Sequence, residues 1–446
     1  MGSPQLPAPY RQATRKFTKK ATHHVTSMNL SAGPEKEASV ALYVHWPFCV
    51  SKCPYCDFNS HVRASTDQDE WRNALLADLA CEARLLPGRT LTSIFFGGGT
   101  PSLMHPSIVE ALIAAAVGHW SPAKNLEITL EANPNSVEAE RFANVAAAGV
   151  NRLSLGLQSF DDEALAFLGR AHSAAEGFRA LEIAQKHFRR VSFDLIYALP
   201  NDTQESWAAT LAQALSLGTK HLSLYQLTIE PGTRFASMVA KHDFEPLDPD
   251  AAATLYELTD AMTSAAGLPA YEISNYARPG QESRHNLTYW RYGDYVGVGP
   301  GAHGRRLGTR TVRHRKPENF LSALRRTGHG IVEEAPLAPS EAADEALVMG
   351  LRLSEGVDAG AIAERFGLLS LVDWERVDRL TASGHLLRDG ARIALTAKGR
   401  LLLDHILGEI AAIAPMNAAT PPVRVEASKP LVQPEPPLAV PAAHCS

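Results

Sequence analysis

The sequence has few cysteines and no long apolar run. Five cysteines in 446 residues are too few for the disulfide framework of a secreted protein. No apolar run approaches the roughly 18 residues of a membrane span, and the N-terminus lacks the apolar core of a secretory signal. The net charge is only -5, so the chain as a whole has no strong attraction for nucleic acid or for an anionic membrane. We therefore expect a cytoplasmic or organelle-interior protein with free thiols and no nucleic-acid partner.

The composition is that of a globular protein, with 45% hydrophobic and 20% charged residues, and the length allows two domains. Both ends differ from this pattern. Residues 1–34 carry five basic residues and no acid, which suits a disordered tail or a mitochondrial-type presequence, and Met28 is an alternative start. Residues 413–446 are rich in Pro and Ala without periodicity, which is typical of disorder.

Three of the five cysteines lie in one stretch, YVHWPFCVSKCPYCDFNSH, over residues 43–61. Cys49, Cys53 and Cys56 have the spacing C-x3-C-x2-C. Three thiolates on one loop can hold a four-iron four-sulfur (4Fe-4S) cluster and leave its fourth iron without a protein ligand, because each iron takes one external ligand. The alternative is a structural zinc site completed by His45 or His61. The clustering favours the iron-sulfur interpretation.

Short β-branched runs alternate with helical patterns from Val40 to about Glu230, which is typical of βα units in a parallel sheet. Six strands are expected, over residues 40–46, 91–96, 126–131, 152–156, 191–197 and 221–227. Six units are fewer than the eight of a closed barrel, so we predict an open α/β partial barrel, (β/α)6, with its active face at the carboxyl ends of the strands.

Polar groups and glycines occur at these strand ends. Residues 97–100 (GGGT) follow the second strand, and consecutive glycines would let backbone N–H groups converge on an anion. Glu131 ends the third strand, where a carboxylate can accept hydrogen bonds from ribose hydroxyls. Gln158 follows the fourth strand, Arg170 lies further along, and Asp194 lies within the fifth. Together these groups predict a site for a charged nucleotide ligand.

The cysteine motif, with Tyr55 before its third cysteine, resembles the radical SAM superfamily. YVHWPFC and CPYCDFNSH are similar to the branch of oxygen-independent coproporphyrinogen dehydrogenase and the HemW-type heme chaperones. The resemblance implies a 4Fe-4S cluster on the three cysteines and an electron donor that reduces it. It also implies S-adenosylmethionine, whose reductive cleavage gives a 5'-deoxyadenosyl radical. The residues that would bind this cofactor are Tyr43, Gly98, Thr100, Glu131, Gln158, Arg170 and Asp194.

One departure separates the two activities of this branch. The porphyrinogen-oxidising enzymes carry a fourth cysteine two residues after the third, where this chain has Asp57 and then Phe58. The resemblance therefore implies a heme chaperone, which binds heme and delivers it to an acceptor protein, with peripheral membrane association as a further expectation. The alternative is an oxygen-independent coproporphyrinogen III oxidase.

A segment dense in aromatics and glycine contains His285, Asn286, Tyr289 and Trp290, an HN-x2-YW motif similar to one associated with heme binding in HemW-type proteins. His285 is the candidate heme ligand, and the alternative is a packed, hydrogen-bonded histidine. Residues 305–316 form a basic run that would either meet porphyrin propionates or lie in a solvated β-hairpin.

The C-terminal part shows helical patterns and a short hairpin at Asp389-Gly390, which resembles a winged-helix module without a basic stripe. The predicted segments are a basic tail (1–38), a radical SAM partial barrel (39–270), a connecting segment (271–335), a smaller α+β winged-helix-like domain (336–411) and a disordered tail (412–446).

Overall fold

The computed structural model describes residues 39–63 and 65–411. Both predicted tails, with the basic N-terminal residues and Met28, lie outside the described residues. Within them, no helix is both long enough and apolar enough to cross a membrane.

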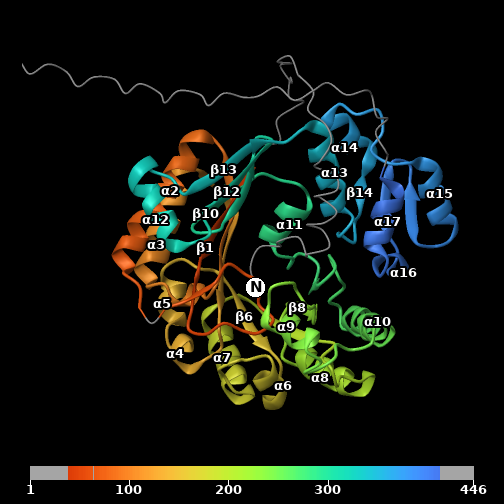
Figure 1. The fold of residues 1–446 in the computed structure, drawn as a ribbon, viewed down its shortest axis with the longest axis horizontal. Helices are drawn as coiled ribbons and strands as arrows, with labels where there is room; N and C mark the ends of the chain where they lie inside the picture. The colour runs from red at the N-terminus through yellow and green to blue at the C-terminus, as the bar shows by residue number, and fades with distance from the viewer. Residues whose placement is uncertain (1–38, 64, 412–446) are drawn as a thin grey trace, which may run out of the picture.

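A parallel sheet forms the centre of the larger domain (Figure 1). Six parallel strands follow one another in sequence order, because each pairs with the next. They are β1 (Ser39–Trp46), β4 (Thr90–Gly98), β5 (Ser121–Ala132), β6 (Arg152–Gln158), β7 (Arg190–Tyr197) and β8 (His221–Gln226). The six predicted strands and the open partial barrel are confirmed.

The sheet is nevertheless larger than we predicted, since it has eleven strands within residues 39–63 and 65–411. On one edge β10 (Tyr295–Val298) pairs parallel to β1, and β11 (His303–Arg306), β12 (Thr309–Arg313) and β13 (Ile331–Pro336) continue antiparallel. On the other edge β9 (Asn275–Ala277) pairs antiparallel with β8. Residues that we expected to connect two domains therefore extend the barrel sheet instead.

Helices between the strands surround the sheet (Figure 1). They are α2 (Gln68–Leu85), α3 (Pro106–His119), α4 (Ser136–Ala139), α5 (Phe142–Ala147), α6 (Asp162–Phe167), α7 (Ala174–His187), α8 (Gln204–Ser216), α9 (Arg234–Ala240), α10 (Pro249–Ala265) and α12 (Pro317–Thr327). The cap of α2 is Asp67, whose side chain accepts hydrogen bonds from the N–H groups of Asp69 and Glu70.

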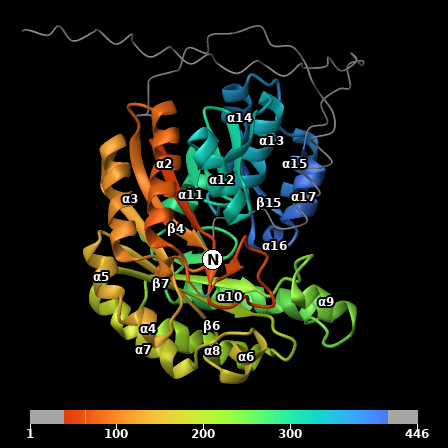
Figure 2. The same cartoon turned by 60° about the vertical axis from the view of Figure 1, so that its left-hand side comes forward.

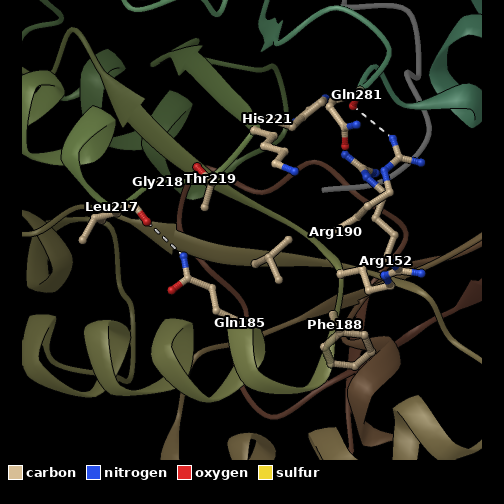
Figure 3. Close-up of a pocket in the computed structure, with 12 residues that line it drawn as sticks. Arg152, Gln185, Phe188, Arg190, Leu217, Gly218, Thr219, His221 and Gln281 are labelled. Carbon is tan, nitrogen blue, oxygen red and sulfur yellow. Dashed lines mark hydrogen bonds between the residues drawn. The ribbon is translucent and has the colours of Figure 1, made fainter.

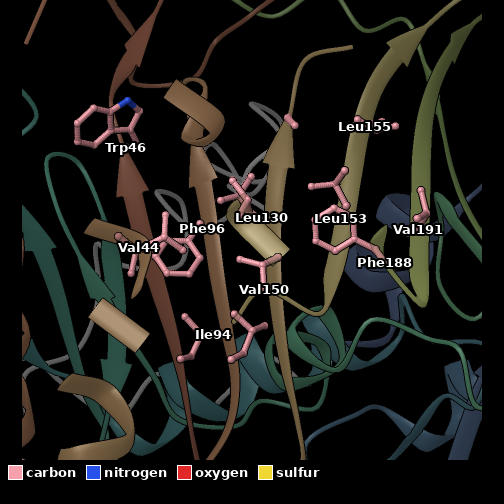
Figure 4. Packing of buried hydrophobic residues seen from close by; sticks show 14 of the residues in the cluster. Val44, Trp46, Ile94, Phe96, Leu130, Val150, Leu153, Leu155, Phe188 and Val191 are labelled. Carbon is pink, nitrogen blue, oxygen red and sulfur yellow. The ribbon is translucent and has the colours of Figure 1, made fainter. Parts of the chain in front are cut away.

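The two faces of the central strands differ in polarity. Leu153 and Leu155 of β6 belong to a continuous apolar core with Phe96 and Leu130 (Figure 4). Side chains alternate along a strand, so Ser154 points to the other face, the inside of the barrel. The inner face is therefore polar and buried, which is where a polar ligand site can form.

Arg306 and Arg313 of the basic run, residues 305–316, are buried, so they are neither solvated nor open to propionates. Arg313 is fully buried and pairs with Asp78 and Glu82 of α2. Arg306 pairs with Glu82 at 2.5 Å and with Glu334 at 2.7 Å. Buried charges need such partners, so these ion pairs hold β11 and β12 against α2.

The C-terminal domain has its own apolar core and lies beside the barrel (Figure 2). It contains α13 (Pro339–Gly350), α14 (Ala359–Phe366), α15 (Trp374–Ala382), α16 (Ala397–Arg400) and α17 (Leu403–Ile410). Its sheet has the order β14 (Val357–Asp358), β16 (Arg392–Leu395), β15 (Leu386–Asp389). Asp389 ends β15 and pairs with Arg392 of β16, and Gly390 lies in the turn between them, so the predicted hairpin is confirmed.

Candidate functional site

The three clustered cysteines lie on the chain that leaves the carboxyl end of β1. Cys49 ends the short strand β2 (Phe48–Cys49), which pairs with β3 (His61–Val62), and Cys53 and Cys56 lie in the loop between these two strands. All three are free thiols and are partly buried. They line one cavity with an empty volume of about 990 Å³, which includes space open to solvent.

Five of the seven residues predicted to bind S-adenosylmethionine line the same cavity. They are Gly98, Thr100, Glu131, Gln158 and Arg170. They come from the ends of β4, β5 and β6 and from the loop after α6, so the carboxyl ends of the parallel strands converge at this place.

The side chains of Thr100 and Arg170, both in the cavity lining, contact the thiols directly. The Thr100 hydroxyl lies 3.5 Å from Cys49 Sγ, and Arg170 Nη1 lies 3.5 Å from Cys53 Sγ. Burial raises the pKa of the Cys49 thiol and raises that of Cys56 to about 11. The thiols of Cys49 and Cys56 are therefore protonated at neutral pH without metal, and iron binding must release their protons because the ligand is the thiolate.

The glycines after β4 do not form the predicted anion cradle. The Gly98 N–H donates to Glu131 Oε2 at 3.3 Å, and the N–H groups of Gly99 and Thr100 donate to the carbonyls of Trp46 and Phe48. A Cβ on Gly99 would lie 2.6 Å from the Phe48 carbonyl oxygen, so glycine is required by the close approach of two chain segments. That prediction was wrong because the sequence does not show where a backbone donor finds its acceptor.

The two predicted carboxylates lie on neighbouring levels of the barrel interior. Glu131 lines the cavity, and burial raises its pKa. Asp194 does not line it; it is buried one layer further in, 3.5 Å from the hydroxyl of Ser154, which does. Burial raises the Asp194 pKa as well. Asp194 therefore lies behind Ser154, outside the lining of the cavity.

Gln158 and Arg170 show that the cavity is built for a polar ligand. Gln158 Oε1 and Arg170 Nε are buried, and neither has a hydrogen-bond partner among the residues that the structure describes. Gln158 also has a φ of 69°, which is unusual for a residue other than glycine. Unsatisfied buried polar atoms and a strained backbone are costly, and both are typical of a binding site. The amino, carboxylate and ribose groups of S-adenosylmethionine fit such a lining.

Asn133 is a cavity residue that the sequence analysis missed. Its Oδ1 accepts a hydrogen bond from Arg170 Nη2 at 2.7 Å, and its Nδ2 donates to Thr100 Oγ1 at 3.1 Å. It therefore joins the two side chains that touch the thiols. Its position two residues after Glu131 was the available signal, because residues i and i+2 of an extended chain share a face.

Tyr43 lies outside the cavity lining. Its hydroxyl is joined to His45 Nδ1 by a 2.9 Å hydrogen bond, and its ring packs against Phe95 beneath the cavity floor. Phe58, by contrast, lines the cavity beside the three cysteines. An apolar ring thus occupies the position at which the oxidising enzymes are expected to have a fourth thiol.

His285 is not placed as an open heme ligand. It lies in α11 (Arg284–Trp290) and is 1% exposed. Its Nδ1 is 2.9 Å from the Ser93 hydroxyl, its Nε2 is 2.8 Å from the Tyr289 hydroxyl, and its ring stacks on Phe95. Burial lowers its pKa to about 3. Both ring nitrogens are engaged, which matches the alternative of a packed histidine.

The aromatics of the same motif join the two domains. Tyr289 and Trp290 are buried in a cluster with Ala342, Ala346 and Met349 of α13. They are therefore part of the contact between the domains and do not form an open aromatic surface.

Comparisons with known proteins agree with this geometry. Residues 43–214 match the family model for the radical SAM superfamily, and residues 337–402 match the model for the HemN C-terminal domain. The solved structure of coproporphyrinogen III oxidase (HemN) from Escherichia coli, described as a radical SAM enzyme, is similar with a TM-score of 0.72 and 25% identity. The match covers 83% of this chain and 90% of that one.

Two curated relatives are more similar in sequence. The heme chaperone HemW of Escherichia coli is 38% identical over 376 residues, which cover 82% of this chain and 97% of the relative. The radical S-adenosyl methionine domain-containing protein 1, mitochondrial, of Mus musculus is 39% identical over 397 residues, which cover 86% of this chain and 90% of the relative.

Proposed function

This chain belongs to the radical SAM superfamily, in the group of the HemW heme chaperones, and we propose that it binds heme and delivers it to an acceptor protein. The observation that carries the proposal is Phe58 in the cysteine cavity. A phenylalanine offers neither a thiol nor a proton at the position where the oxidising branch is expected to carry its fourth cysteine. The near full-length similarity to HemW proteins supports the same conclusion.

The proposed roles of the cavity residues follow from their positions. Cys49, Cys53 and Cys56 would hold three irons of a 4Fe-4S cluster, which when bound can supply electrons to S-adenosylmethionine. Thr100 and Arg170 contact the sulfurs and would orient the loop that carries them.

The remaining cavity groups would bind the organic cofactor. Glu131 would accept hydrogen bonds from the ribose. The atoms of Gln158 and Arg170 that lack a partner, Oε1 and Nε, would form hydrogen bonds with the cofactor. Asp194 would act behind Ser154, and Tyr43 would support the floor through His45.

The proposed partners are heme, a heme-acceptor protein and an electron donor, with peripheral membrane association and no nucleic acid. The proposed location is the cytoplasm, which suits a protein whose thiols must stay reduced to bind iron. A role in porphyrin metabolism follows from the cargo.

The function is tested by anaerobic reconstitution followed by two parallel assays. We expect the wild-type protein to bind heme, seen as a shifted heme absorption band, and to release no carbon dioxide from coproporphyrinogen III. Decarboxylation that depends on S-adenosylmethionine would instead establish the alternative, an oxygen-independent coproporphyrinogen III oxidase. The variant Phe58→Cys tests the argument about the missing thiol, since it restores that group with the rest of the cavity unchanged.

A further inference from the structure

A second cavity lies at the amino ends of β6, β7 and β8, away from the cysteine cavity at the carboxyl ends (Figure 3). It has an empty volume of about 780 Å³, including space open to solvent. Apolar groups of Phe188, Val191 and Leu217 form part of its wall. Nothing in the proposed reaction uses this cavity.

The lining of this cavity is strongly basic. It contains Arg152, Arg189, Arg190 and Lys220, and no Asp or Glu is among the lining residues. Arg190 is already engaged, because its guanidinium pairs with Glu127 at 2.6 Å and donates to the carbonyls of residues 281 and 282. The other three cations have no carboxylate partner in the described part of the chain. The electrostatic potential in the cavity is therefore positive.

Arg152 makes the cavity more than a basic surface. The Arg152 residue is only 3% exposed. Its guanidinium donates a hydrogen bond to the neutral hydroxyl of Ser192, at 3.2 Å. A buried guanidinium is costly unless an anion compensates it. Among the described residues Arg152 forms no ion pair with a carboxylate, and the buried Asp194 attracts it only from a longer distance, so the guanidinium can still take a direct anionic partner.

Two further buried polar atoms on the same wall lack partners. Thr219 Oγ1 and His221 Nδ1 have none among the residues that the structure describes. His221 Nε2 is 3.0 Å from the Tyr271 hydroxyl, so its other nitrogen remains for a ligand. A hydroxyl, an imidazole and a guanidinium can all donate to one oxyanion.

We propose that this cavity is a binding site for the carboxylate or phosphate group of a small anionic molecule, held by Arg152 with Thr219, Lys220 and His221. Two sources carry this chemistry. One is a propionate of heme, an assignment that rests on the proposed function; the other is a free anion such as phosphate.

The test compares wild-type protein with Arg152→Gln and Lys220→Ala, and uses Lys186→Ala on the exposed surface of α7 as the matched control. Heme, heme dimethyl ester and inorganic phosphate are titrated into anaerobically reconstituted protein. The iron-sulfur absorption and far-ultraviolet circular dichroism verify that each variant is folded. Lys220 is exposed, so its variant tests the site even if Arg152→Gln fails to fold.

If the anion is a propionate, Lys220→Ala and Arg152→Gln weaken heme binding by about tenfold or more, and the dimethyl ester binds all proteins equally. If it is a free anion, heme affinity is unchanged and calorimetric phosphate binding is lost in the same variants. Unchanged binding of both probes in both variants would overturn the proposal. A wild-type protein that binds phosphate and no heme would contradict the chaperone function and leave this site standing.

Discussion

The variant His285→Ala tests whether His285 is a structural histidine or a heme ligand. The side chain is joined to Ser93 at 2.9 Å and to Tyr289 at 2.8 Å, and its ring centroid lies 4.9 Å from that of Phe95. All of these contacts are buried. We therefore expect the variant to lose stability, and its folded fraction to keep the heme absorption spectrum of the wild type.

The magnitude follows from these contacts. Each buried partner left unsatisfied costs about 1–3 kcal/mol, and loss of an aromatic stack costs about 0.5–1.5 kcal/mol. Together the expected loss is roughly 2.5–7.5 kcal/mol, a large share of the about 5–15 kcal/mol that stabilises a typical domain. Some of the variant is expected to be unfolded at 37 °C.

Urea unfolding of the anaerobically reconstituted protein measures the loss, and the heme spectrum is recorded on the monomeric folded fraction. His405→Ala is the matched control, because that side chain is 76% exposed. It should change stability by less than about 0.5 kcal/mol. A heme band that shifts in folded His285→Ala protein of wild-type stability would refute the reasoning and restore His285 as the ligand.

Three further outcomes are expected. Cys53→Ala should abolish the iron-sulfur absorption after reconstitution and Cys81→Ala should not; full iron in the first variant would contradict the cluster assignment. Glu131→Ala should weaken S-adenosylmethionine binding by about 1–3 kcal/mol in calorimetry with the cluster intact, whereas unchanged affinity would remove Glu131 from the ribose. Burial lowers the pKa of His45 and of His172 to about 4. Because the unfolded state binds these protons first, urea-derived stability should fall as the pH drops from about 6.5 to 4, and a flat profile would contradict this.

The sequence predicted those parts of the structure that depend on local pattern. The six parallel strands follow from period and composition, and the cysteine loop from its spacing. Glu131 and Gln158 could be placed in one cavity without coordinates, since the carboxyl ends of parallel strands meet at one edge, whereas Arg170 of the loop after α6 was assigned there by the family resemblance.

The parts that the sequence did not predict depend on contacts between distant segments. Arg313 pairs with Asp78, 235 positions away, so a basic run that reads as solvated is buried. The Gly99 N–H meets the Trp46 carbonyl, which turns an expected anion cradle into a packing contact. His285 is 192 positions from Ser93. In each case the residue type indicated a possible role, but the sequence did not show which distant residue the side chain or backbone group would contact.

The barrel interior has opposite charge at its two ends, and strand geometry explains how one sheet can carry both. Inward-facing positions recur every second residue, so Arg152 and Ser154 of β6 share the inner face about 6.6 Å apart along the strand. Glu131 lines the cysteine cavity and Asp194 lies one layer further in, whereas Arg152 lies toward the amino end. Glu131 therefore favours a cationic group in its part of the cysteine cavity, where Arg170 also supplies a positive charge, and Arg152 favours an anion in the opposite cavity. The neutral hydroxyls of Ser154 and Ser192, 3.1 Å apart, lie between Arg152 and Asp194, so these two groups attract each other across a polar layer and form no direct ion pair.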